Sequence, residues 1–184
     1  MTDGVKDKMN YADIKQYDVA NGTGIRVSLF VSGCTHHCKE CFNKETWDFQ
    51  YGDPFTDNEI EKILGFLKPD YVAGLTLLGG EPMEPVNQEG LLPLLRQVHG
   101  KYPEKNVWCY SGYLFDRDIV GKMFRESDVT RELLSYIDIL VDGEFIQEKK
   151  NLKVNFRGSD NQRIIDVKKS LAAGEVIHWD GEIV

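Results

Sequence analysis

Short apolar runs alternate with amphipathic stretches along the chain. The run GIRVSLFVSGC, which begins at Gly24, is rich in β-branched residues, and AGLTLLGG at 73–80 is apolar and closed by two glycines. Both patterns are typical of buried strands. Further strands are predicted at 106–111 (NVWCYS), 137–143 (IDILVDG) and 161–167 (NQRIIDV), and EVIHWDGEIV at 175–184 suggests a short hairpin.

Helices are predicted between these strands. Thr56 and Glu59 form a capping-box pattern, T-D-N-E, before the amphipathic stretch IEKILGFL. Residues 87–101 carry apolar side chains at helical spacing, with Pro93 early enough to be tolerated. A polar helical stretch follows the strand at 106–111.

The resulting order, β-α-β-α-β-α-β-β, predicts an α/β fold with a largely parallel sheet and right-handed crossovers. A complete eight-unit β/α barrel takes about 250 residues, so this chain predicts an open, partial parallel barrel of about five to six strands, or an open doubly wound sheet. We expect a single domain over residues 1–184, with the polar residues 1–10 flexible.

Composition narrows the classes of function. The net charge of −8 disfavours binding to nucleic acid, whose phosphates are also negative. No apolar run reaches the roughly 18 residues that span a bilayer, and the N-terminal MTDGVKDKMNY lacks the apolar core of a signal peptide. We therefore expect a cytoplasmic protein without membrane contact, in which structural disulfides are rare.

Ligands of parallel α/β sheets bind at the carboxyl ends of the strands. At these ends the predicted strands place Cys34, the turn at 79–81, Ser111 and Asp142. The sequence therefore predicts that these residues face one common mouth.

Three of the four cysteines follow the first of these strands in CTHHCKECF, with the spacing C-x3-C-x2-C at Cys34, Cys38 and Cys41. Clustered thiols in a reducing compartment indicate metal or redox chemistry. A zinc site would need a fourth ligand, such as a histidine of this loop or Cys109. An iron–sulfur cluster on three thiolates would instead leave one iron open for a substrate or cofactor.

Simpler roles are expected for several other residues. Cys109 lies within a predicted strand and is expected to be a packed core thiol, because free cysteine is among the most buried residue types. His36 and His37 are expected in a solvated loop. Asp142 ends a buried strand and needs a partner for its charge, and Arg26 is expected to form a salt bridge or to contact a cofactor.

The cysteine spacing, followed by Phe42, resembles the signature of the radical S-adenosylmethionine enzymes, as does GGEP at 79–82. The resemblance implies a [4Fe–4S] cluster on the three cysteines, with S-adenosylmethionine at the open iron. Glycines let the backbone approach a ligand closely, and Glu81 is expected to bind the ammonium group of the cofactor. The residues that the resemblance assigns to cofactor binding are Glu40, Phe42, Gly79, Gly80, Glu81 and Ser111.

A narrower resemblance extends from about residue 10 to 170. NGTGIRVSLFVSGC, CFNKETW, PFT, VWCYSGY, LVDGEF and RGSDNQRIID are similar to the activating proteins of anaerobic ribonucleoside-triphosphate reductases, although that family often shows N-G-P-G where this chain has N-G-T-G at 21–24. The resemblance implies an oxidoreductase that cleaves S-adenosylmethionine reductively and generates a glycyl radical on the reductase. An electron donor such as flavodoxin would be a second partner.

Two alternatives remain open at this point. A small radical S-adenosylmethionine enzyme that acts on a small molecule, similar to 7-carboxy-7-deazaguanine synthase, would share both motifs. A non-catalytic zinc-binding module would share only the clustered cysteines.

Overall fold

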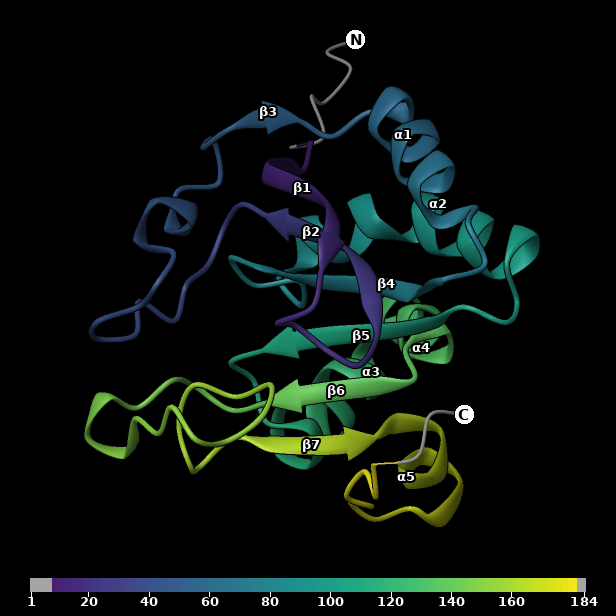
Figure 1. Cartoon of the computed structure of the whole chain (residues 1–184). Helices are drawn as coiled ribbons and strands as arrows, with labels where there is room; N and C mark the ends of the chain where they lie inside the picture. Colours follow the sequence, from purple (N-terminus) through teal and green to yellow (C-terminus); the bar gives the residue numbers. More distant parts are fainter. Residues whose placement is uncertain (1–7, 182–184) are drawn as a thin grey trace, which may run out of the picture.

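The computed structural model describes residues 8–181, and this part of the chain forms one sheet of seven strands in the order β3-β1-β2-β4-β5-β6-β7 (Figure 1). Helices cover one face of the sheet. The strands are β1 (Asn10–Asp18), β2 (Ile25–Val31), β3 (Asp53–Pro54), β4 (Val72–Gly79), β5 (Asn106–Ser111), β6 (Ile139–Asp142) and β7 (Arg163–Asp166).

The central strands pair in parallel, as predicted. β2, β4, β5 and β6 are parallel neighbours, with Leu29 opposite Leu77 and Leu77 opposite Cys109. The outer strands are different: β1 and β3 are antiparallel beside β2, and β7 is antiparallel to β6. The prediction of an open α/β sheet is confirmed, whereas a largely parallel sheet of five to six strands is wrong.

β1 and the two-residue β3 are the strands that the hydrophobic pattern does not reveal, and β1 is the longer of them. Its pairing with β2 shifts register between Tyr11 and Asp13 and again between Lys15 and Asp18. Such irregularities break the alternation of buried and exposed side chains by which a strand is recognised. The prediction that residues 1–10 are flexible concerns mainly residues 1–7, which lie outside the described range. It is wrong for Met9, which is buried, and for Asn10, which begins β1.

The larger hydrophobic core lies between the sheet and the helices behind it (Figure 1). Leucine and valine side chains of β2 and β4 pack there, together with Cys109, whose predicted burial is confirmed. No helix within residues 8–181 is long and apolar enough to cross a membrane. The helices are α1 (Asp57–Leu67), α2 (Pro85–Lys101), α3 (Phe124–Glu126), α4 (Asp128–Tyr136) and α5 (Val167–Ala173), with a π-helix η2 (Phe115–Met123) and short 3-10 turns η1 (Lys44–Trp47) and η3 (Gln147–Lys149).

Local sequence signals determine where the first two helices, α1 and α2, begin. The predicted capping box is present, because the Thr56 amide donates to Glu59 at 2.8 Å and the Thr56 hydroxyl oxygen accepts from the amide of Asn58 at 3.3 Å. α2 begins at Pro85, whose fixed φ suits a first helical turn. Pro93 therefore lies in the helix interior and not near its start, contrary to the prediction.

Arg26 joins the central strands on the face opposite the helices. It is fully buried and donates to Thr76 Oγ1 at 2.7 Å, to the Leu75 carbonyl at 2.8 Å and to Asn106 Oδ1 at 2.8 Å. Its guanidinium also lies 5.5 Å from the centroid of the Trp108 ring. The expected salt bridge or cofactor contact is thus replaced by hydrogen bonds to neutral acceptors, which hold β2, β4 and β5 together.

The C-terminal segment differs from the predicted hairpin at 175–184. After β7 the chain enters α5, and the segment beyond it returns to β7, with Ile165 bridged to His178 and the Trp179 amide donating to the Ile164 carbonyl at 2.9 Å. The described part of 175–184 therefore extends the sheet edge and does not pair with itself. Residues 182–184 lie outside the described range.

Candidate active site

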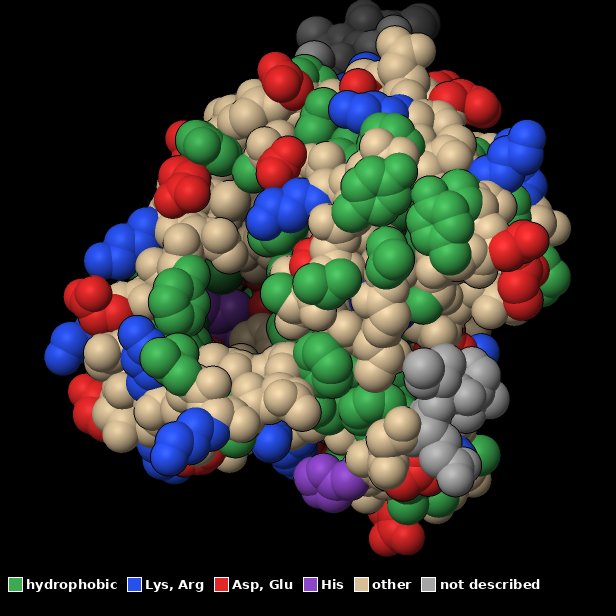
Figure 2. Space-filling view, viewed as in Figure 1, with side chains coloured by type: hydrophobic (Ala, Val, Ile, Leu, Met, Phe, Trp, Pro, Cys, Tyr) green, Lys and Arg blue, Asp and Glu red, His purple; other side chains and the backbone are tan. Residues whose placement is uncertain are grey.

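A cavity of about 530 Å³ opens at the carboxyl ends of the parallel strands, between the loop after β2 and the loop after β6 (Figures 1 and 2). Figure 2 shows the hollow, with hydrophobic side chains around it and a histidine inside it. Eight of the nine predicted site residues line this cavity: Cys34, Cys38, Cys41, Phe42, Gly79, Gly80, Glu81 and Ser111.

The cysteine loop is anchored by its backbone. The Gly33 amide donates to the Thr46 carbonyl at 2.8 Å, and the Cys34 amide donates to the Trp47 carbonyl at 3.3 Å. The ring of His37 stacks on Trp47 with 4.6 Å between centroids. These contacts fold residues 34–48 into a compact loop at the end of β2, where all three of its thiols reach one cavity.

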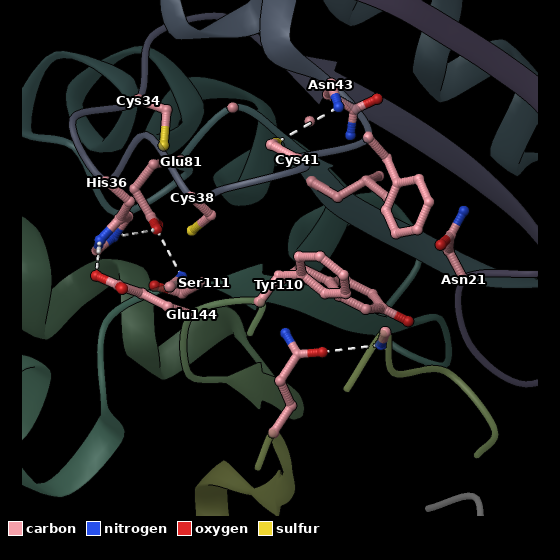
Figure 3. Close-up of a pocket in the computed structure, with 18 of the residues that line it drawn as sticks. Asn21, Cys34, His36, Cys38, Cys41, Asn43, Glu81, Tyr110, Ser111 and Glu144 are labelled. Carbon is pink, nitrogen blue, oxygen red and sulfur yellow. Dashed lines mark hydrogen bonds and ion pairs between the residues drawn. The ribbon is translucent and has the colours of Figure 1, made fainter. Parts of the chain in front are cut away.

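The thiols of Cys34, Cys38 and Cys41 come from this one loop (Figure 3). Burial raises the pKa of Cys34 to about 12 and also raises that of Cys38. Thiolates at such positions need a nearby positive charge, which bound iron supplies. Within residues 8–181, no three His, Cys, Asp or Glu side chains lie close enough to hold a single metal ion. A cluster of several irons, in which each thiolate binds a different iron, suits the donor set.

The two glycines of GGEP bring the second motif against the cysteine loop. Gly79 has a φ of 106°, in the region that favours glycine. A Cβ on Gly80 would lie 2.6 Å from the Gly33 carbonyl oxygen, and the Glu81 amide donates to that same oxygen at 2.8 Å. The glycines therefore allow backbone to pack on backbone between the two motifs.

Glu81 is almost fully buried in the cavity wall. Its Oε1 accepts from the Met83 amide at 2.8 Å, and its Oε2 accepts from the Gly112 amide at 2.7 Å and from His36 Nε2 at 3.0 Å. Both carboxylate oxygens are thus held by protein donors. The expectation that Glu81 binds the ammonium group of a cofactor stays a prediction. The protein contacts already set the orientation of the carboxylate that would do so.

The expectation that His36 belongs to a solvated loop is wrong. Its side chain is 9% exposed, and Nδ1 lies 2.9 Å from Glu144 Oε1 while Nε2 faces Glu81 (Figure 3). Burial lowers the pKa of His36, but the hydrogen bonds and charges of Glu81 and Glu144 outweigh it and raise the pKa to about 9. Because carboxylates only accept, the imidazolium form satisfies both contacts.

The three other residues predicted to bind the cofactor, Ser111, Phe42 and Glu40, differ in how close they lie to the cavity. Ser111 is buried at the end of β5, and its hydroxyl oxygen accepts from the Tyr113 amide at 3.1 Å. Phe42 is 65% exposed at the cavity edge, with its ring 5.4 Å from that of Phe145. Glu40 does not line the cavity: its side chain is exposed, 3.9 Å from Lys44.

Asp142 also lies away from the cavity, so the predicted common mouth is wrong at this residue. Its carboxylate is fully buried, accepts from the Phe115 amide at 2.7 Å and pairs with Arg163 at 2.5 and 2.9 Å. The need for a partner is confirmed, and the partner comes from the antiparallel strand β7.

The loop after β6 supplies a wall that the sequence did not assign to the site. Its contributions include Glu144, Phe145, Phe156 and Arg157. The available signal was the position of Asp-Gly-Glu-Phe directly after a buried strand, where cavity residues are expected. The sequence could not show that residues 154–162 fold back beside it.

Two residues that line the cavity, Tyr110 of β5 and Arg157 of the loop after β6, each have a buried polar atom without a hydrogen-bond partner among residues 8–181: the Tyr110 hydroxyl and Arg157 Nε. Burial raises the pKa of Tyr110 above its usual value, so the hydroxyl stays protonated. Buried polar groups normally have hydrogen-bond partners.

Comparison with known proteins agrees with this donor set. A family model described as a 4Fe-4S single cluster domain matches residues 20–165, which include all three clustered cysteines. Over 158 residues the chain is 43% identical to the anaerobic ribonucleoside-triphosphate reductase-activating protein of Haemophilus influenzae, a match that covers 85% of this chain and 97% of that protein. The chain belongs to this family of activating proteins.

Other reductase-activating proteins are similarly close. The protein of Enterobacteria phage T4 is 40% identical, with 85% of this chain and 93% of that protein covered. The protein of Escherichia coli K12 is 36% identical, with 84% and 96% covered. As a reductase-activating protein the chain is an enzyme, and the 4Fe-4S domain match supports an iron–sulfur cluster over the zinc-binding alternative.

Proposed function

We propose that this protein activates an anaerobic ribonucleoside-triphosphate reductase, using a [4Fe–4S] cluster and S-adenosylmethionine to generate a glycyl radical on it. The observation that carries the proposal is that Cys34, Cys38 and Cys41 line one cavity with Gly79, Gly80 and Glu81. When bound, the cluster would supply one electron for the reductive cleavage of S-adenosylmethionine, and the cleaved cofactor would supply the hydrogen-atom acceptor for a glycine of the reductase.

The residues of the chain would bind and orient these groups. The three thiolates hold iron, and the neighbouring GGEP turn presents backbone amides and carbonyls beside them. Tyr110 and Arg157 line the same cavity and would contact the cofactor there. Apolar side chains, among them Phe30, Leu78 and Phe156, line the same cavity and would exclude water from a reactive intermediate.

The proposed substrate is a segment of another protein, which must enter the cavity as backbone. The open sheet suits this, because the cavity lies between two loops and is not enclosed by strands on all sides (Figures 1 and 2). The electron donor we propose is a small redox protein such as flavodoxin, in the cytoplasm.

Electron paramagnetic resonance tests the proposal directly. Anaerobically purified protein is expected to be brown, with about four iron atoms per chain. After reduction and mixing with S-adenosylmethionine and the reductase, a glycyl radical signal should appear. Cys34→Ala, Cys38→Ala and Cys41→Ala should each abolish it, because each removes a cluster ligand.

Cys109→Ala serves as the matched control, because this thiol is fully buried in the core and away from the loop. It should retain both the iron and the radical signal. Colourless wild-type protein with one zinc, or a signal that persists in any of the three loop variants, would contradict the proposal. A cofactor that is cleaved without any radical on the reductase would favour a small-molecule substrate.

A further inference from the structure

His36 lies between two of the cluster cysteines but its side chain is occupied elsewhere. Nε2 is 3.0 Å from Glu81 Oε2, and Nδ1 is 2.9 Å from Glu144 Oε1 (Figure 3). Glu81 belongs to the GGEP turn after β4, and Glu144 to the loop after β6. One imidazole therefore joins three segments that are remote in sequence.

The surroundings leave the ring little freedom to move. A Cβ on Gly112 would lie 2.6 Å from His36 Cδ2 and 2.7 Å from Nε2, so the ring rests directly on the backbone after β5. The ring of Tyr113 packs against it edge to face, with 4.3 Å between centroids. Three other segments thus hold the imidazole: the GGEP turn, the loop after β6 and the residues that follow β5.

The Gly112 amide shares the same acceptor, Glu81 Oε2, at 2.7 Å. Glu81 is 1% exposed, and a buried carboxylate is costly unless it is paired and hydrogen-bonded. Two backbone amides hold its orientation, and His36 is the side chain that contacts it, with Nε2 at hydrogen-bond distance from Oε2. Without the imidazole, the Glu81 carboxylate would keep its amide contacts but lose its side-chain contact with the cysteine loop, leaving only the backbone contact with Gly33.

We propose that His36 is a positioning residue, which ties the cysteine loop to Glu81 and Glu144 and so sets the placement of bound S-adenosylmethionine relative to the cluster. The inference rests on the proposed function and deepens it. Ligands of metal sites commonly depend on such outer hydrogen bonds for their orientation. Here the bridge acts between the two halves of one site: the thiols that hold iron and the turn that receives the cofactor.

The test compares His36→Ala with His99→Ala in anaerobically reconstituted holoprotein. His99→Ala is the matched control, because it removes a histidine that is exposed on α2 and does not line the cavity. Three quantities are measured: iron content, the dissociation constant of S-adenosylmethionine, and the change that the cofactor causes in the resonance spectrum of the reduced cluster.

His36→Ala should keep about four irons per chain but bind S-adenosylmethionine about tenfold more weakly and lose most of the cofactor-induced spectral change. His36→Gln should recover part of the affinity, because its amide donates to one carboxylate. Gly112→Ala, which displaces the ring, should act in the same direction as His36→Ala. His99→Ala should bind the cofactor as the wild type does.

Unchanged affinity and an unchanged spectral response in both His36→Ala and Gly112→Ala would overturn the proposal. A second combination of results would also overturn the proposal. In it, His36→Ala loses iron, whereas Gly112→Ala keeps its iron and binds S-adenosylmethionine as the wild type does. If wild-type protein itself neither binds S-adenosylmethionine nor changes its spectrum, the proposed function fails, and the result is distinguishable from failure of His36 alone.

Discussion

At the scale of single residues, buried carboxylates determine which segments of the chain meet, both at the cavity and away from it. Asp142 and Glu81 are 0% and 1% exposed, and each meets a cationic or cation-forming side chain from another segment: Arg163 for the first and His36 for the second. In both cases backbone amides complete the set of donors. Such pairs specify which segments meet, because leaving either carboxylate alone is costly.

Removing Arg163 should therefore destabilise the fold. Arg163→Met is expected to lower the free energy of unfolding by about 3 kcal/mol, because the buried Asp142 carboxylate loses its partner. The Asp142→Asn/Arg163→Met double variant should lose less, since a neutral amide can still accept from the Phe115 amide. Urea denaturation followed by circular dichroism measures both.

Arg117→Met provides the comparison for this pair. Arg117 contacts Asp118 at 2.7 Å on the surface, where its side chain is 71% exposed. Exposed ion pairs contribute little, so no measurable change is expected. Equal losses in Arg163→Met and Arg117→Met would show that burial of Asp142 does not decide the effect.

At the scale of elements, the sequence signals that worked were local ones. The capping box of α1 depends on residues three apart, and the strand at 106–111 was predicted with the bounds that β5 has. β1 and the orientation of β7 depend on which strand pairs with which. Register shifts in β1 and a long loop before β7 hide those partners from any local pattern.

The cap of α1 allows a quantitative test. Thr56→Ala should lower the free energy of unfolding by about 1 kcal/mol, because the hydroxyl oxygen no longer accepts from the first turn. Thr56→Ser keeps that oxygen and should lose much less. Chemical denaturation distinguishes them, and a Ser variant as unstable as the Ala variant would argue that the methyl group, and not the cap, matters.

At the scale of the whole molecule, the hydrophobic core and the cysteine loop are separate. The larger core lies between the sheet and α1, α2 and α4, and does not include the three loop thiols. Small zinc domains unfold without their metal because the metal supplies their folding energy. A chain with its own core of this size has no such dependence.

Removal of iron should therefore leave the fold intact. Protein stripped by oxidation and a chelator is expected to keep its far-ultraviolet circular dichroism and a cooperative urea transition close to that of the holoprotein. The control is the holoprotein carried through the same steps without oxidant. Loss of cooperativity on removal of iron would contradict the independence of core and loop.

The sequence by itself determined α1, α2 and the central strands, the cysteine and GGEP motifs, and through them the family. These features arise from periodicity and spacing within short segments, where the backbone geometry alone relates one residue to the next. Only the tertiary structure decided the antiparallel edge strands and the ion pair of the buried Asp142 with Arg163. It also decided the contacts of His36 with Glu81, 45 residues away, and with Glu144, 108 residues away. These depend on which side chains meet after folding, because hydrogen bonds and charge pairs act over a few ångströms of space whatever the separation along the chain.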